Sequence, residues 1–253
     1  MRREHAITLV RIAWLTGAVL AIELLCRTGI INPLTLIAPS EMAIALWHLL
    51  VSGEIKGDIV QTFSTVATAL ALAVTLGFAL GAVVHALPRV RRALDPLLAS
   101  YYSVPTFVFY PLFVAIFGLN TIPLIVLGMA FGVPAMMMAT LNGLDRVPRV
   151  LMKTARIHRL GRLQTIALIV LPSAAPYLFT GVKLALAYAF IGIIAGEFIL
   201  ASSGLGHSIS YAYDGFESRT MYALMLFVLG IVTIMNLMLH VWEARLMRRR
   251  TRA

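Results

Sequence analysis

Charge and cysteine are both scarce in this sequence. Charged residues make up 13% of the 253 residues, about half of the ~25% in a typical soluble domain. The single cysteine, Cys26, cannot form a disulfide within the chain, which excludes a disulfide-stabilised scaffold. The motifs G-x-x-x-x-G-K-[ST], H-E-x-x-H and G-x-S-x-G are missing as well. Neither a P-loop ATP site nor these common hydrolytic sites are therefore expected on this chain.

Apolar residues are abundant instead. Hydrophobic residues make up 60% of the chain, and its mean hydropathy is +0.90. A soluble core of this size cannot hide that much apolar surface, because every folded protein exposes a large part of its area. The composition therefore predicts an all-α integral membrane protein. The net charge of +10 does not indicate nucleic-acid binding, because the basic residues lie in short blocks between apolar segments.

Six segments are long and apolar enough to cross a bilayer, which takes about 20 residues. These predicted transmembrane helices are 8–26, 60–86, 97–117, 121–143, 174–200 and 221–243. Gly77 and Gly81 form G-x-x-x-G in the second, a spacing that permits close helix contact. Within 39–57, Ser40 is a candidate cap for a short amphipathic helix on the outer surface. No long linker divides the chain, so residues 1–253 are expected to form one transmembrane domain.

The basic residues predict the orientation of the spans. Sixteen of the 21 Lys and Arg residues lie before span one, between spans two and three, between spans four and five, or after span six. Three lie on the opposite side, namely Arg27, Lys56 and Arg219. By the positive-inside rule, both termini and the two basic loops are expected in the cytoplasm, with the chain crossing the cell inner membrane several times.

The segment 145–172 is too long for a simple turn between two spans. Basic residues recur every three positions there, among apolar residues such as Val150 and Ile157. A repeat of three drifts around a helix of 3.6 residues per turn, so two short helices with a bend near Leu160–Gly161 are expected. Gly161 permits the unusual backbone conformation of such a bend. The resulting surface suits docking into a partner's groove, and it equally suits contact with anionic lipid headgroups.

This segment resembles the cytoplasmic EAA loop of ATP-binding-cassette (ABC) importer permeases, which reads E-A-A, then a glycine, then I-x-L-P. Thr154–Ala155–Arg156 and Ile169–Val170–Leu171–Pro172 match an ungapped placement of that pattern. Lys153 then stands where the family has Glu, Arg159 stands where it has Gly, and Gly161 lies two residues late. The resemblance implies an ATPase-coupling loop formed by Lys153, Thr154, Ala155, Arg156, Arg159, Leu160, Gly161, Leu163, Leu171 and Pro172.

Further matches to the family follow in order over about residues 37–210. They include Ile37–Glu41, Leu94–Leu98, Tyr110–Gly118, and an A-x-E…G-L-G segment at Ala195–Glu197 and Ser203–Gly206. Each match is short, and their shared order makes the resemblance specific. The nearest branch is the nitrate, aliphatic sulfonate and taurine type, which also includes permeases for thiamine precursors and aromatic acids.

The resemblance implies a type I ABC importer permease fold with a cytoplasmic coupling helix, which moves a small anion or vitamin precursor by alternating access. It also implies two cytoplasmic ATPase subunits that bind ATP and Mg, an external solute-binding protein, and no cofactor on this chain. Because six spans make half a pathway, a second copy of the chain is expected about a two-fold axis. The alternative is an autonomous channel or ion-coupled carrier, although the inverted repeats and midplane charges common in carriers are not evident.

The third predicted span is the first candidate for the solute pathway. Its prolines, Pro105 and Pro111, interrupt helical hydrogen bonds, which is tolerable only against protein or a wet cavity. Tyr102, Ser103 and Thr106 can supply the missing partners. The pattern is typical of a pathway-lining helix, and equally of a kinked packing helix.

Two ionisable residues in the fifth predicted span also need an account, because charge inside a membrane is expensive. Glu197 is expected to organise helices by accepting hydrogen bonds from the Gly204–Gly206 turn, with a direct role in transport as the alternative. Lys183 is expected to extend its ammonium group toward the cytoplasmic interface.

Overall fold

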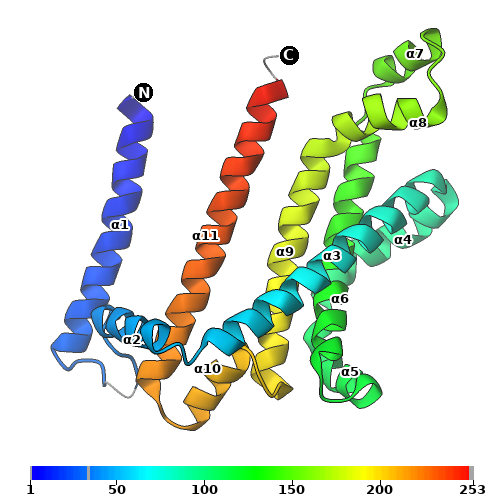
Figure 1. The fold of residues 1–253 in the computed structure, drawn as a ribbon. Helices are drawn as coiled ribbons and strands as arrows, with labels where there is room; N and C mark the ends of the chain where they lie inside the picture. The colour runs from blue at the N-terminus through cyan, green and yellow to red at the C-terminus, as the bar shows by residue number, and fades with distance from the viewer. Residues whose placement is uncertain (1, 33–34, 251–253) are drawn as a thin grey trace.

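The computed structural model describes residues 2–32 and 35–250, with the exception of the side chains of residues 2–9, 12, 102 and 244–250. Every regular element in this part of the chain is a helix (Figure 1). The α-helices are α1 (Arg2–Arg27), α2 (Pro39–Ser52), α3 (Lys56–Ala86), α4 (Pro88–Ser100), α5 (Tyr110–Phe117), α6 (Thr121–Asp145), α7 (Arg149–Ile157), α8 (Arg162–Thr165), α9 (Leu171–Leu200), α10 (Leu205–Asp214) and α11 (Ser218–Arg250). Two 3₁₀ turns, η1 (Tyr101–Ser103) and η2 (Thr106–Phe109), and a π-helical turn, η3 (Ile166–Val170), complete them.

Residues with special backbone or capping chemistry set the helix boundaries. Leu87 has φ −119° and ψ 81°, and Pro88 after it occupies the first turn of α4, because a residue before proline avoids the helical region. Gly118 ends α5 with φ 80°. The Asn120 side chain then accepts a 2.8 Å hydrogen bond from the N–H of Ile122, which satisfies a free donor at the start of α6.

The core of the bundle is made by α6, which packs against both α3 and α9. Glycines bring these backbones close together. A Cβ atom added to Gly77 would lie 2.7 Å from the Cβ of Met136, and one added to Gly81 would lie 2.7 Å from the Cβ of Thr140. A Cβ atom at Gly181 would meet the Cβ of Ala139 at 2.6 Å. The close contact expected from the G-x-x-x-G spacing in α3 is therefore confirmed.

Four helical segments of the described residues are long and apolar enough to cross a membrane. They are Lys56–Ala86, Thr121–Asp145, Arg162–Asp214 and Ser218–Glu243, and they contain the predicted spans 60–86, 121–143, 174–200 and 221–243. The predicted span 8–26 is helical as part of α1, which stands apart from the α3–α6–α9 core in Figure 1. An all-helical membrane protein is confirmed at this level.

The predicted span 97–117 is wrong as one continuous helix. The chain there passes from the end of α4 through η1, an extended stretch at Val104 and η2 to the eight-residue α5. Pro105 cannot donate a backbone hydrogen bond, and it forces Val104 into the extended region, at φ −89° and ψ 124°. The basic block at 89–92, expected in a loop, lies in α4.

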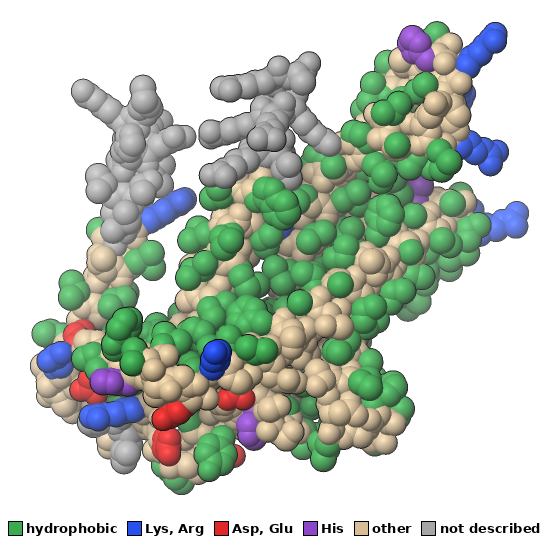
Figure 2. Space-filling view, in the orientation of Figure 1, with side chains coloured by type: hydrophobic (Ala, Val, Ile, Leu, Met, Phe, Trp, Pro, Cys, Tyr) green, Lys and Arg blue, Asp and Glu red, His purple; other side chains and the backbone are tan. Residues whose placement is uncertain are grey.

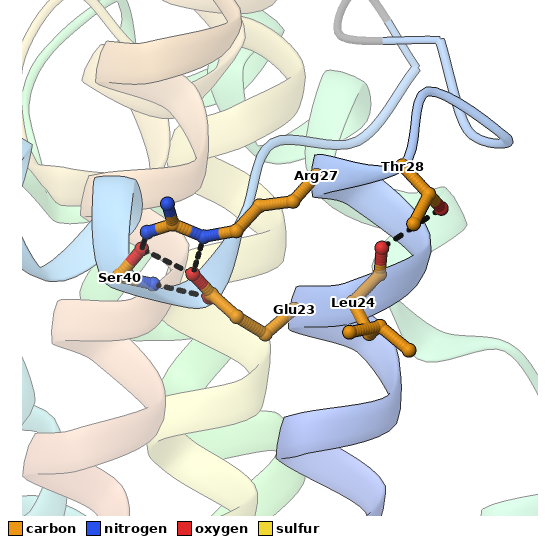
Figure 3. Close-up of polar contacts among 5 residues, drawn as sticks. All are labelled: Glu23, Leu24, Arg27, Thr28 and Ser40. Carbon is orange, nitrogen blue, oxygen red and sulfur yellow. Dashed lines mark hydrogen bonds and ion pairs between the residues drawn. The ribbon is translucent and has the colours of Figure 1, made fainter.

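The expected outer helix is present as α2, which ends at Gly53 with φ 76°. It begins at Pro39, so Ser40 lies inside the helix and does not cap it. Figure 3 shows how α1 holds this end: the Glu23 carboxylate accepts hydrogen bonds from the Ser40 N–H at 3.0 Å and hydroxyl at 2.6 Å, and from the Arg27 Nε–H at 2.6 Å. A carboxylate is favourable at a helix N-terminus, so this contact pins α2 to α1.

The structure gives Lys183 a partner that the sequence did not predict. Its Nζ lies 2.8 Å from Oε2 of Glu243 on α11, the last residue of the Ser218–Glu243 segment, so the ammonium group pairs across two helices. Phe179 and Trp242 pack edge to face beside the pair, with ring centroids 5.4 Å apart. The pairing of opposite charges accounts for a lysine inside an apolar helix.

Replacing Gly77 by alanine should destabilise the bundle. The new Cβ atom would lie 2.7 Å from the Cβ of Met136 and 2.8 Å from the carbonyl oxygen of Val133, which is backbone and cannot rotate away. Overpacking of this kind costs about 1–3 kcal/mol, and thermal unfolding in detergent should show a lower Tm. Gly230 in α11 is the matched control, because nothing lies within 4 Å of its added Cβ. Equal Tm values for the two variants would contradict the close contact.

Candidate functional site

The segment between α6 and α9 folds into two short helices, as predicted. Helix α7 ends at Ile157 and α8 begins at Arg162, so the chain bends between them. Ala155 on α7 is buried, whereas Ile157 and Leu163 are 78% and 82% exposed. In Figure 1, α7 and α8 project beyond the ends of α6 and α9. The result is a small knob that presents apolar side chains outward.

The bend is a Schellman motif centred on Arg159. The N–H of Leu160 donates to the Ala155 carbonyl at 3.0 Å, and the N–H of Arg159 donates to the Arg156 carbonyl at 3.1 Å. These are the two hydrogen bonds that define the motif, whose C′ residue is left-handed and usually glycine. Arg159 has φ 52°. The ungapped placement of the EAA pattern had put Arg159 at the glycine position, so the backbone there follows the pattern although the residue does not.

Gly161 has a different role from the expected one. Its backbone is extended, with φ −65° and ψ 165°, so it is not the residue that adopts an unusual conformation. It begins α8 as the N-cap. Its N–H donates to Oε1 of Gln164 at 3.0 Å, and its carbonyl accepts the N–H of Thr165 at 2.9 Å. Through this cap and the π-helical turn η3, α8 runs directly into α9.

The predicted coupling residues fall into three environments. Those on the outside of the knob are exposed, namely Lys153, Thr154, Arg156, Arg159, Gly161 and Leu163. Ala155 is buried and Leu160 is half-buried. Leu171 and Pro172 are half-buried at the start of α9, below the knob. The structure thus brings residues 153–163 together and places 171–172 where the knob joins the bundle.

A charged cluster that the sequence reasoning missed lies at the C-terminal end of α6. The Arg91 guanidinium binds both carboxylate oxygens of Asp145, at 2.6 and 2.5 Å, and Nδ1 of His85 lies 3.2 Å from the same carboxylate. Asp145 raises the already high pKa of Arg91, so the arginine stays charged at physiological pH. Arg146, next along the chain, donates to the Tyr177 hydroxyl on α9 at 3.2 Å. These contacts join α3, α4, α6 and α9 where the knob begins.

Glu197 is completely buried near the C-terminal end of α9. The Thr62 hydroxyl donates to its carboxylate at 2.8 Å, and the N–H of Gly206 donates to it at 2.9 Å. The predicted hydrogen bond from the Gly204–Gly206 turn is therefore confirmed. The Thr62 oxygen also accepts the N–H of Leu205 at 2.9 Å. One carboxylate and one hydroxyl thus connect α3, α9 and α10, whose first turn would otherwise bury free donors.

Asp58 extends this network, one helical turn before Thr62. It accepts the N–H of Gly204 at 2.9 Å and the hydroxyl of Ser208 at 2.5 Å. Gly204 has φ 108°, and an added Cβ would lie 2.4 Å from Cδ of Glu197, so only glycine fits. Sequence reasoning missed Asp58 and Thr62. Their i, i+4 spacing at the start of an apolar helix is the signal that could have found them.

The other predicted pathway residues do not join Glu197. Thr106 is buried, and its hydroxyl donates to the Val104 carbonyl at 3.2 Å. Ser103 and Pro105 are exposed, and the side chain of Tyr102 lies outside the described residues. Among the described residues, no group of three or more His, Cys, Asp and Glu side chains could hold a metal ion.

Comparison with known proteins assigns this architecture. Residues 73–252 match the family described as binding-protein-dependent transport system inner membrane component. The chain is 28% identical over 200 residues to the nitrate import permease protein NrtB of Synechococcus elongatus, covering 77% of this chain and 71% of that protein. It is 30% identical over 179 residues to the taurine transport system permease protein TauC of Escherichia coli, covering 70% and 65%. The fold matches a chain of the inward-facing MetNI methionine ABC transporter, with a TM-score of 0.63 at 18% identity over 77% of this chain and 94% of that one.

Changing Arg159 to glycine should stabilise the knob. A non-glycine residue in the left-handed region costs roughly 1–2 kcal/mol, and glycine removes most of that cost. Hydrogen exchange of the α7 amides should slow about threefold or more in the variant. The matched control, Lys153→Gly, lies in the middle of α7 and should speed exchange, because glycine destabilises a helix interior by about 1 kcal/mol. Faster exchange in Arg159→Gly would show that the arginine is not strained.

Changing Glu197 to glutamine should lower the yield of folded protein. The amide nitrogen replaces one carboxylate oxygen, so two N–H donors enter a buried site where the groups that contact the carboxylate are themselves donors. An unsatisfied buried donor costs about 1–3 kcal/mol. The readout is the fraction of monodisperse protein after heating in detergent. Glu243→Gln, in which Lys183 keeps an oxygen acceptor, is the comparison. An unchanged yield with altered solute selectivity would indicate a transport role instead.

Proposed function

This chain belongs to the family of binding-protein-dependent transport system inner membrane components and is the permease subunit of an ABC importer, and from that premise we propose that its 145–172 knob is the docking element through which the ATPases drive the pathway. ATP is bound and hydrolysed on a separate subunit, and this family carries no cofactor on the permease. The proposal concerns how this chain uses its own residues within that assembly.

The observation that carries the proposal is the exposure of large apolar side chains on a basic knob. Val150, Ile157 and Leu163 are 71%, 78% and 82% exposed. Covering such side chains stabilises a contact by about 1.5–3 kcal/mol each. The knob projects away from the bundle in Figure 1, which favours a protein groove over the bilayer surface as its partner. Arg156, Arg159 and Lys153 then form a charged rim around the apolar contact.

The same geometry suggests how a push on the knob reaches the membrane. Helix α8 runs through η3 into α9 without a break, and Asp145 anchors the other side of the knob to Arg91. Leu171 and Glu197 lie roughly 39 Å apart along α9, at 1.5 Å per residue. A displacement at the inner end of α9 therefore moves the outer network of Glu197. This coupling supports alternating access, in which the two ends of one rigid helix open and close in turn.

The charges support the proposed orientation. Figure 2 shows Lys and Arg side chains, and no Asp or Glu, at the end that carries α7 and α8, whereas Asp and Glu side chains lie together with Lys and Arg at the opposite end, near α2. We place the knob and both termini in the cytoplasm, with α2 on the outer face beside a solute-binding protein. In this arrangement α1 and the 88–117 region complete the membrane domain of residues 1–253, and two copies of the chain with two ATPases form one importer. The names of NrtB and TauC favour a small inorganic or organic anion as solute.

Replacing Leu163 by aspartate should uncouple the ATPase. The change puts a charge into the proposed apolar contact, and losing one buried leucine corresponds to about a tenfold weaker association or more. The measurement is ATPase recovery with the tagged chain from membranes in mild detergent. Phe216→Asp is the matched control, because Phe216 is 88% exposed at the outer end, beyond α10.

Equal ATPase recovery with Leu163→Asp and with the unchanged chain would contradict the docking proposal. Solute transport by the purified chain without any ATPase would instead support an autonomous channel or carrier. Both variants should insert in the membrane at the same level, since neither residue is buried in the bundle.

A further inference from the structure

A groove of about 310 Å³ between α6 and α9 has a largely apolar lining that also contains four polar side chains. Its walls include Asn142 on α6 and Tyr177, Thr180 and Tyr188 on α9. The α9 residues recur at helical spacing, so they form one stripe. Tyr177 and Tyr188 lie roughly 16 Å apart along the helix. The groove thus extends from the inner end of the bundle toward its middle.

The exposed face of α3 at the same depth is different. Met136 marks the shared depth, because it meets Gly77 of α3 and Gly181 of α9. The exposed stripe of α3 there consists of Leu72, Leu76, Leu80 and Val83. An apolar stripe of this kind suits lipid. In contrast, Asn142 is exposed and its amide makes no hydrogen bond to any described residue. An unpaired amide is costly in hydrocarbon, so the groove faces water or a polar ligand.

The electrostatics of the groove select the charge of that ligand. The Arg146 guanidinium stands at its inner mouth, 5.2 Å from the centroid of the Tyr177 ring. The neighbouring Asp145 is already paired with Arg91, so the positive charge of Arg146 is not cancelled locally. No Asp or Glu lines the groove among the residues described there. The mouth is therefore positive.

The hydrogen-bonding groups agree with this charge. Arg146 donates to the Tyr177 oxygen, which leaves the Tyr177 hydroxyl proton free to donate elsewhere. The Asn142 amide supplies two more N–H donors. The Thr180 hydroxyl is different, because it donates to the Pro176 carbonyl at 3.1 Å. The donors of Asn142 and Tyr177 thus line one groove with the apolar Met138 and Leu184, and Arg146 contacts that groove through Tyr177.

Resting on the proposed function, we infer that this groove is a solute subsite in the inner half of the pathway, which takes a small anion with a carboxylate or sulfonate group. Arg146, Tyr177 and Asn142 hold the anionic group, and Met138 and Leu184 accommodate an apolar remainder. The same anionic chemistry occurs in phospholipid headgroups, and the experiment below separates the two sources by the depth that an aqueous reagent reaches.

The test uses single-cysteine variants of the complete importer in inside-out vesicles. Cys26→Ser removes the only native cysteine, and Leu184→Cys then places a thiol inside the groove. Leu76→Cys is the matched control, because Leu184 and Leu76 are 43% and 42% exposed. They lie within one helical turn of Ala185 and Ala73, which both meet Gly132, so their depth is similar. The probes are the anionic 2-sulfonatoethyl methanethiosulfonate and its cationic trimethylammonioethyl counterpart. Leu184→Cys should react at least tenfold faster than Leu76→Cys, and adding Arg146→Gln should lower its anion-to-cation rate ratio about tenfold.

Three results would overturn the inference. A Leu184→Cys thiol as unreactive as Leu76→Cys would mean that lipid fills the groove. An unchanged rate ratio with Arg146→Gln, in a variant that still recovers the ATPase, would mean that Arg146 does not select charge. A preference for the cationic reagent would assign the groove to another solute class. Anion-selective labelling of a chain that recovers no ATPase would instead keep the subsite and refute the docking proposal.

Discussion

Close backbone contact between α6 and its two neighbours is the constraint on which the rest of this structure depends. In a bilayer, an apolar side chain gains little by leaving lipid for protein, so helices associate through shape and close packing. Small residues meet that demand on both sides of α6. A Cβ atom added to Gly132 would lie 2.8 Å from the Cβ of Ala73 on α3, and one added to Gly128 would meet the side chain of Ile193 on α9 at 2.9 Å. Because α3 and α9 both pack closely against α6, the positions of α3 and α9 relative to each other are fixed at both ends of the bundle.

Carboxylates then tie the bundle at its two ends. Glu197 and Asp58 satisfy the first turn of α10 at one end, and Asp145 joins α6 to Arg91 at the end that carries the knob. The first network connects three helices and is buried at Glu197 and Thr62 and half-buried at Asp58. The second is partly exposed next to the knob. The first network also explains why an acidic residue is retained within the apolar α9.

In the knob, a left-handed backbone conformation is kept at a position where the residue type differs from the family pattern. The family pattern has glycine where this chain has Arg159, and the Schellman motif still forms there with φ 52°. Gly161, two residues later, caps α8 instead. The Arg159 guanidinium lies on the exposed rim of the knob, and the left-handed conformation of this residue strains the backbone. The local hydrogen bonds, and not the residue type, decide which position is left-handed.

Much of this protein was readable from local chemistry. Apolar runs of sufficient length predict helices, so four of the six predicted spans match helices long enough to cross a membrane, and the period of three in 145–172 predicted two short helices with a bend. The Gly204–Gly206 turn and Glu197 lie close in sequence, so their hydrogen bond was predictable too. The prolines at 105 and 111 signalled an interrupted helix, although its division into η1, η2 and α5 depends on neighbours that hydropathy does not register.

The contacts between distant residues were decided only by the tertiary structure. Thr62 and Glu197 are separated by 135 positions and Lys183 and Glu243 by 60, and no periodicity relates them. Asn142 and Tyr177 reach one groove because α6 and α9 pack through glycines, not because of their own sequence context. Hydropathy determines that a segment is helical and lies in a bilayer, since that depends on its own side chains. Which face of the helix meets a partner, lipid or solute depends on the whole bundle.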